Sequence, residues 1–249
     1  MTAAEARKLY KNTLAQVDHL DHSGAAAALK LLADLRDYVE REFSRSDWAS
    51  HRAGQLLTGI EKATKDFRDR YWGELQGWQK TAFELGLSLP GAFDSGISWA
   101  GIWRQGFEAY ADNGLHLITD LSDDLRQALK REVLLATTGA ETPAQAMQFV
   151  RDLLGGGRAA EARAAAIVTT EVGRNFSIAN YLGLKQAQEV VPELLKMWLH
   201  PGGGKTSRPE HVAMNGETRE MDQPFDFSGG PLMYPQDPDG DPGETINCH

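Results

Sequence analysis

Apolar residues recur at helical spacing along most of the sequence. The stretch DHSGAAAALKLLADLRDYVEREF places Leu32, Leu35 and Val39 on one stripe, and this spacing of three to four residues is typical of an amphipathic helix. Asp21 or Ser23 offers a side chain that caps the start of such a helix. The same spacing continues in AGQLLTGIEKATKDFRDRYWGELQGWQ. The pattern therefore predicts a largely helical first half.

Three further helices are predicted between residues 122 and 182. The first runs over about Ser122–Thr138, where SDDL supplies an N-cap followed by acidic residues. The second covers about Thr142–Leu154, with Thr142 as the N-cap and Pro143 at the first helical position. The third runs from about Ala159 to Leu182, and Gly183 is a candidate C-cap.

The composition changes near residue 200. Seven of the ten prolines lie at or after Pro201, and glycine and proline make up 15 of the last 49 residues. Segments of strand length (HVAM, PFDF and PLMY) lie there between turn signals. The predicted fold class is α+β: a predominantly helical chain with a small mixed α/β C-terminal module.

Charge and cysteine content narrow the functional classes. A net charge of −9 argues against a general nucleic-acid coat, because phosphate binding needs clustered Lys and Arg. The one cysteine, Cys248, cannot form an internal disulfide, which favours a reducing compartment. There is no apolar signal segment and no stretch of about 18 apolar residues. We therefore expect a soluble intracellular product without a membrane-spanning segment.

A calcium loop is one interpretation of DPDGDPGE. Asp237, Asp239 and Asp241 occupy positions 1, 3 and 5 of the calcium-loop pattern. Pro242 stands where that pattern requires glycine, and Cys248 stands where it requires glutamate. A proline-rich turn with solvated acids explains the segment better, although weak calcium binding stays open.

Two other ligand motifs are incomplete. Gly-Lys-Thr in HPGGGKTS lacks the first glycine of a phosphate loop, because Leu199 stands there. Cys248 and His249, together with His211 or His200, are candidate zinc ligands, but a structural zinc site uses four ligands. We predict no metal and no cofactor.

A polar group lies within the predicted helix around residues 159–182. Arg174 lies four residues after Thr170 and three residues after Glu171, so it shares a helix face with both. One interpretation is a surface salt bridge of small energetic weight. The other is a buried clamp that ties this helix to the C-terminal segment. Buried Glu171 then needs a donor, for which Arg208 is a candidate.

SRPEHVAMNG is the second polar group. Arg208 precedes His211 by three residues, and Asn215 and Gly216 form a turn signal. Arg208 and His211 satisfy buried backbone groups in one interpretation. In the alternative, they act with Glu171 as the site of a hydrolase or transferase.

Taken in order, these pieces resemble the Mu F-like minor head proteins of tailed bacteriophages. The similarity covers roughly residues 120–249, so we divide the chain into a helical region, 1–117, and a Mu F-like domain, 118–249. This sequence departs from the family's closing Asn-Cys-x-Cys, because it ends at His249. The residues that carry the resemblance are Thr170, Glu171, Arg174, Lys196, Trp198, Arg208, His211, Gly216, Pro235, Asp237, Asn247 and Cys248.

The resemblance implies a non-enzymatic virion component. Such a protein is made in the bacterial cytoplasm and acts in head morphogenesis at the portal vertex, with a role in DNA packaging or ejection in some members. The expected partners are the portal protein and a capsid or scaffold protein. Direct DNA binding is an alternative, although the last 49 residues hold three basic residues against nine acids.

The closing ETINC is expected to complete a compact domain. We predict that Ile246 and Cys248 pack inward near Trp198 or His211, and that Asn247 bonds to the backbone. Full exposure of both Ile246 and Cys248 in an otherwise ordered domain would contradict this prediction.

Overall fold

The chain forms two compact units, each assembled from separate stretches of sequence. The computed structural model describes residues 3–45, 48, 50–92, 100–155, 159–200 and 207–246. Unit 1 contains Met1–Ser23, Gln76–Asp112 and Thr169–His249, whereas unit 2 contains Gly24–Leu75 and Asn113–Val168. The boundary predicted between residues 117 and 118 falls inside unit 2, so it does not coincide with a break between these units.

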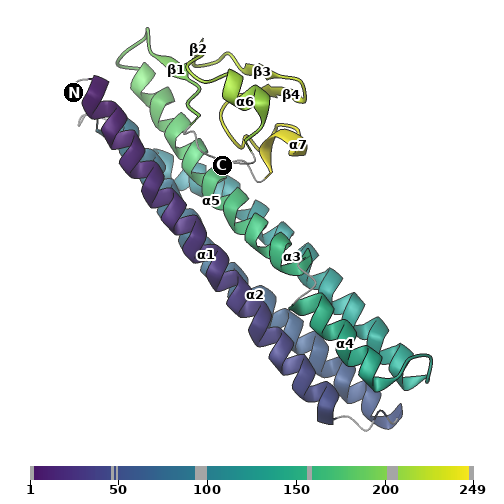
Figure 1. Ribbon diagram of the computed structural model, residues 1–249. Helices are drawn as coiled ribbons and strands as arrows, with labels where there is room; N and C mark the ends of the chain where they lie inside the picture. The colour runs from purple at the N-terminus through teal and green to yellow at the C-terminus, as the bar shows by residue number, and fades with distance from the viewer. Residues whose placement is uncertain are drawn as a thin grey trace. The chain divides into compact units, whose positions relative to one another are not determined.

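The predicted fold class is confirmed, because long helices precede a small C-terminal part with short strands and helices. Figure 1 follows these elements from purple to yellow in chain order. No helix in the described part of the chain has the length and apolar character needed to cross a membrane. The helices of the first part are α1 (Ala3–Arg45), α2 (Ser50–Gly91), α3 (Ala100–Thr137), α4 (Pro143–Leu154) and α5 (Ala159–Gln188).

The helix predicted over Thr142–Leu154 is confirmed as α4, and its predicted N-cap residue, Thr142, is also confirmed. Thr142 precedes the helix, and its Oγ1 accepts a hydrogen bond from the backbone N–H of Gln145. The Gln145 side chain in turn accepts from the backbone N–H of Thr142 at 2.9 Å. This reciprocal pair is the capping box, with Pro143 at the first helical position.

Three predicted helix ends are wrong because the helices are longer. Asp21 and Ser23 lie inside α1, and Ser122 lies inside α3. Ser23 Oγ donates to the carbonyl of Leu20 at 2.9 Å. Ser122 Oγ instead reaches the Thr64 carbonyl on α2. Short polar side chains are tolerated in helix interiors when they bond to a carbonyl in this way. Gly183 is also interior, because α5 continues to Gln188.

Unit 2 is built from helices that bury many apolar side chains. A buried tyrosine, Tyr71, donates its hydroxyl to the carbonyl of Ala164 at 2.5 Å and so links α2 to α5. Other fully buried side chains repeat at helical spacing on each helix, as the amphipathic pattern predicts. They include Leu32 and Val39 on α1, Ile60 on α2, Leu121, Leu129 and Val133 on α3, and Val150 and Leu154 on α4.

A buried carboxyl group interrupts this core. Glu132 on α3 is 3% exposed, and its Oε1 has no hydrogen-bond partner within the described ranges. Burial, together with the neighbouring Glu141, raises the pKa of Glu132 to about 7 against a smaller opposing effect of Arg131. The folded chain therefore holds a proton between pH 4.5 and about 7 that the unfolded chain releases.

Glu132→Gln is expected to flatten the pH dependence of stability. The wild-type chain should lose stability as the pH rises from 4.5 through 7, because the native state must then carry a buried charge. Above pH 7 the neutral variant should be more stable by roughly 1–3 kcal/mol. Urea unfolding at a series of pH values measures this difference. Exposed Glu74, replaced by glutamine, is the control. If the free energy of unfolding changed equally with pH in wild type and in Glu132→Gln, the raised pKa of Glu132 would be contradicted.

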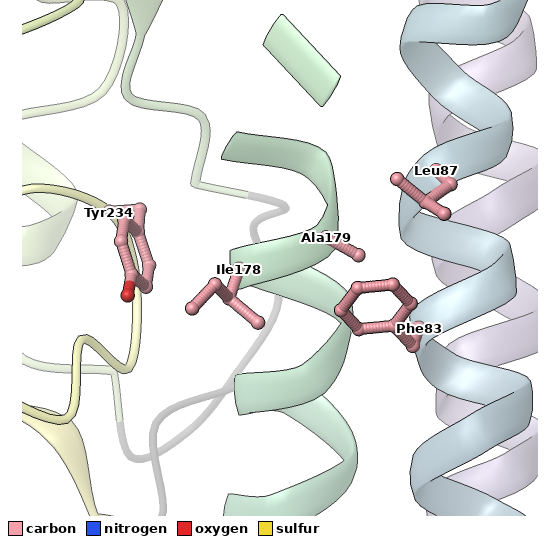
Figure 2. Close-up of a cluster of buried hydrophobic side chains, with 5 residues drawn as sticks. All are labelled: Phe83, Leu87, Ile178, Ala179 and Tyr234. Atoms are coloured by element: carbon pink, nitrogen blue, oxygen red, sulfur yellow. The ribbon is translucent and has the colours of Figure 1, made fainter. Parts of the chain in front are cut away.

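In unit 1, α5 packs closely against α2. Figure 2 shows Ala179 and Phe83 turned toward each other from these two helices, with Ile178 directed toward Tyr234. Gly86 makes this approach feasible, because a Cβ added there would lie 2.3 Å from the carbonyl oxygen of Phe176. Small residues at a helix–helix contact, here Gly86 and Ala179, allow the two backbones to approach closely.

The C-terminal module, residues 195–246, lies in unit 1. It contains two antiparallel two-stranded sheets, in which β1 pairs with β2 and β3 pairs with β4. PFDF is the predicted strand β3, and PLMY contributes to β4. HVAM was predicted as a strand, but it lies mostly in helix α6, which starts at Pro209. The elements are β1 (Leu195–Met197), α6 (Pro209–Ala213), β2 (Thr218–Glu220), β3 (Phe225–Phe227), β4 (Gly230–Leu232) and α7 (Pro242–Thr245).

Candidate functional site

Unit 1 contains a buried ion pair between Glu171 and Arg174. Glu171 is 0% exposed, and its Oε1 accepts a hydrogen bond from Arg174 Nη1 at 2.5 Å. Its Oε2 accepts from Gln79 Nε2 of α2 at 2.9 Å. The pair is therefore buried, and the surface interpretation is wrong. The donors are Arg174 and Gln79, whereas Arg208, the candidate partner, bonds elsewhere.

Arg174 also reaches the C-terminal module. Its Nε donates to the carbonyl of Gln236 at 3.4 Å, a long hydrogen bond. Gln236 adopts a left-handed backbone conformation with φ of 59°. A Cβ added at Gly173 would lie 2.0 Å from Gln236 Oε1, so the glutamine side chain packs directly on the helix backbone. This geometry agrees with the predicted clamp between α5 and the C-terminal segment.

Asp237 holds the turn that follows β4. It is 4% exposed, and its Oδ2 accepts from the backbone N–H of Met233 at 2.8 Å. Its Oδ1 accepts from the backbone N–H of Asp239 at 3.1 Å. These bonds use the carboxylate as a cap for the turn. No group of three metal-ligating side chains occurs in the part of the chain that the structure describes.

Lys196 on β1 is enclosed by aromatic rings. It is 5% exposed, and its Nζ donates to the carbonyl of Met233 at 2.9 Å. The ammonium lies 5.3 Å from the ring centroids of both Tyr181 and Phe225, within the range of cation–π attraction. Burial, together with the charge of nearby Lys185, lowers the pKa of Lys196 to about 8. Lys196 thus joins β1 to the segment after β4.

Trp198 is the centre of an aromatic cluster in the module. Its ring centroid lies 4.9 Å from that of Phe227, 5.3 Å from that of Phe225 and 5.5 Å from that of His211. Its carbonyl accepts from the N–H of Gly216 at 2.8 Å. Gly216 has φ of +91°, which favours glycine at this turn.

His211 and Arg208 both bind the end of the described chain. His211 Nε2 lies 2.9 Å from Glu244 Oε2, and the imidazole is buried. Arg208 Nη2 donates to the carbonyl of Ile246 at 2.9 Å. Both residues therefore hold the closing segment, as the structural interpretation of this motif predicts for Arg208.

The prediction for the tail is partly wrong. Ile246 is 45% exposed, so it does not pack inward on the aromatic cluster. Its backbone, rather than its side chain, makes the contact, because Arg208 binds the carbonyl. Asn247 and Cys248 lie outside the described residues, and so does the proposed zinc ligand His249.

A cavity of about 460 Å³ adjoins the module within unit 1. It lies among α1, α5 and the module, and His211 is the member of the alternative catalytic trio that lines it. Glu171 bonds to Arg174 and Gln79, and Arg208 bonds to Ile246. The remaining motif residues are Thr170, which is buried on α5, and Pro235, which lines the cavity with Trp198 and Gln236.

Sequence reasoning missed the partners that come from distant elements. Gln79, Gln236 and Tyr181 complete the clamp and the lysine enclosure. Gln236 lies between Pro235 and Asp237, two residues that carry the resemblance, so the sequence already drew attention to its neighbourhood. Gln79 lies in an ordinary helical stretch that carries no motif.

Comparisons with known proteins give one distant similarity. The chain is 24% identical over 196 residues to the "Uncharacterized protein YqbB" of Bacillus subtilis (strain 168). The aligned region covers 75% of this chain and 61% of that protein, so the chain spans less than two thirds of its length. No protein family matches the chain, and no solved structure does. The name of this relative states no activity.

Proposed function

We propose that this chain is a structural minor head protein of a tailed bacteriophage. The observation that supports the proposal is the placement of the ordered motif residues within unit 1. Arg174, which is paired with Glu171, binds the module to α5, whereas Lys196, Trp198 and Asp237 hold the module's strands and turns together. These residues all help to hold the C-terminal module together or to join it to α5, which is why we read the motifs as one structural set.

In this proposal the protein acts in head assembly at the portal vertex. The long amphipathic helices bind the portal protein, and the C-terminal module serves as a folded interaction domain. A capsid or scaffold protein is a further partner, and the virion is its final location. Amphipathic helices with exposed polar faces are suited to such contacts.

The enzymatic alternative has no specific observation in its favour. It requires Glu171, Arg208 and His211 around one substrate. Each of these side chains instead bonds to a different group: Arg174 and Gln79, the Ile246 carbonyl, and Glu244. The DNA-binding alternative requires phosphate contacts, and the C-terminal module is rich in acids.

Co-expression with the portal protein encoded in the same genome tests the proposal. A tagged chain should copurify with portal subunits and should be found in purified proheads. A folded chain that neither binds the portal nor enters proheads would refute the proposal. The DNA-binding alternative is tested by measuring affinity for duplex DNA across a salt series. Phosphate contacts would make that affinity fall as the salt concentration rises.

A further inference from the structure

Exposed apolar side chains gather in one short stretch of the described chain. Ten large hydrophobic residues are exposed among the described residues, and five of them lie between residues 190 and 199. Large exposed apolar groupings mark interaction sites more often than single exposed residues do. We call these five residues the apolar strip: Val190, Val191, Leu195, Met197 and Leu199.

The strand β1 explains why the strip faces outward. Successive side chains of a strand point to opposite faces. Lys196 and Trp198 point inward and are 5% and 4% exposed, whereas Leu195 and Met197 are each 53% exposed. The inward positions are therefore already occupied by the module's own contacts, whereas the outward positions carry apolar side chains that stay exposed among the described residues.

The backbone of β1 has a second side available for pairing. Trp198 N–H donates to the Glu217 carbonyl at 2.9 Å, so Trp198 directs its backbone groups toward β2. Because this direction alternates along an antiparallel strand, Leu195 and Met197 of β1 direct their N–H and C=O groups to the opposite edge. Within the described ranges, β2 is the one strand that pairs with β1.

Charged side chains keep many natural edge strands from pairing with other chains, but β1 has no such charge on its exposed face. Lysine at an exposed edge position usually prevents unwanted pairing. The lysine of β1, Lys196, instead points inward to the Met233 carbonyl. The charges beside the strip are acidic: Glu189 and Glu193 flank Val190 and Val191 in sequence, and Glu220 pairs across from Leu195. All three glutamates are exposed.

We propose that the free edge of β1 binds an extended segment of a partner protein, which adds a third strand to the sheet. The partner segment carries apolar side chains at alternate positions, which cover the strip, and Lys or Arg at its flanks, which face the glutamates. Main-chain hydrogen bonds supply affinity in this mode, and the side chains supply specificity. The inference does not depend on the phage assignment.

A second copy of this chain fits the edge less well. Pairing β1 with itself would bring the same acidic residues of two copies together, which is unfavourable. A three-residue strand also buries far less than the 1,200–2,000 Å² typical of stable protein interfaces. A basic partner segment avoids the repulsion, and it need not form a stable complex through this edge alone.

Selection from a random peptide library tests the proposal, with the full chain as bait. Selected peptides should share alternating apolar residues flanked by Lys or Arg. The synthetic consensus peptide should bind the chain with a measurable Kd, and N-methylation of its alternate amides should weaken binding about tenfold, close to the loss of one or two hydrogen bonds.

Met197→Lys should also weaken binding of that peptide by about tenfold or more, because it places a charge within the strip. Leu134→Lys, at a residue 54% exposed in unit 2, is the matched control and should leave the Kd unchanged. Circular dichroism checks that both variants fold. No consensus, an acidic consensus, or binding insensitive to Met197→Lys would overturn the proposal. A dimer that Met197→Lys dissociates would also overturn it in favour of a second copy.

Discussion

Glu171→Ala is expected to lower the free energy of unfolding by about 3–5 kcal/mol, because it leaves a buried guanidinium without its counter-ion. Arg174 is 6% exposed, and among the described residues its other hydrogen bond is the long one to the Gln236 carbonyl. Gln79 Nε2 would lose its acceptor as well. The loss is a large share of the 5–15 kcal/mol that ordinarily stabilises a folded protein.

Denaturant unfolding followed by circular dichroism and tryptophan fluorescence measures this change. Arg163→Ala is the matched control, since Arg163 and Asp124 form an ion pair of the same 2.5 Å length whose side chains are 44% and 65% exposed. Exposed pairs contribute about 0–1 kcal/mol. A double replacement of Glu171 and Arg174 by methionine should cost less than Glu171→Ala, because no charge is left buried. A similar small loss for Glu171→Ala and Arg163→Ala would contradict the buried clamp.

Local sequence signals identified the parts of the fold that depend on near neighbours. Thr142 and Pro143 predicted the start of α4, because a capping box is complete within four residues. Glu171 and Arg174 were recognised as a pair because they lie three residues apart on one helix. The exposure of that pair was undecided, since burial depends on α2 and on the C-terminal module.

Long-range contacts account for most of the errors. Asp21 and Ser122 resemble caps, yet both lie inside helices because the residues before them also favour helix. Asp21 accepts a hydrogen bond from Thr169 on α5 at 2.7 Å, across 148 residues. Arg208 was a candidate donor for Glu171, whereas the fold places it against the Ile246 carbonyl. Periodicity contains no information about such pairings.

Trp198→Ala is expected to destabilise the C-terminal module by about 3–5 kcal/mol, the usual cost of removing a buried large aromatic side chain. Trp198 is 4% exposed and packs against Phe225, Phe227 and His211. The module holds only short strands and helices, so it has few other apolar contacts with which to compensate. The loss should therefore appear as local opening of residues 207–246.

Amide hydrogen exchange resolves this local effect. In Trp198→Ala, protection should fall for the amides of β2 and β3, while the unit 2 helices keep theirs, because their core contains none of these residues. Met197→Ala is the control from the same strand, since Met197 is 53% exposed on the opposite face. It should change stability by no more than about 0.5 kcal/mol. Equal loss of protection in both units would mean that the module does not open independently. Intact protection in β2 and β3 would mean that Trp198 is not the residue that holds the module together.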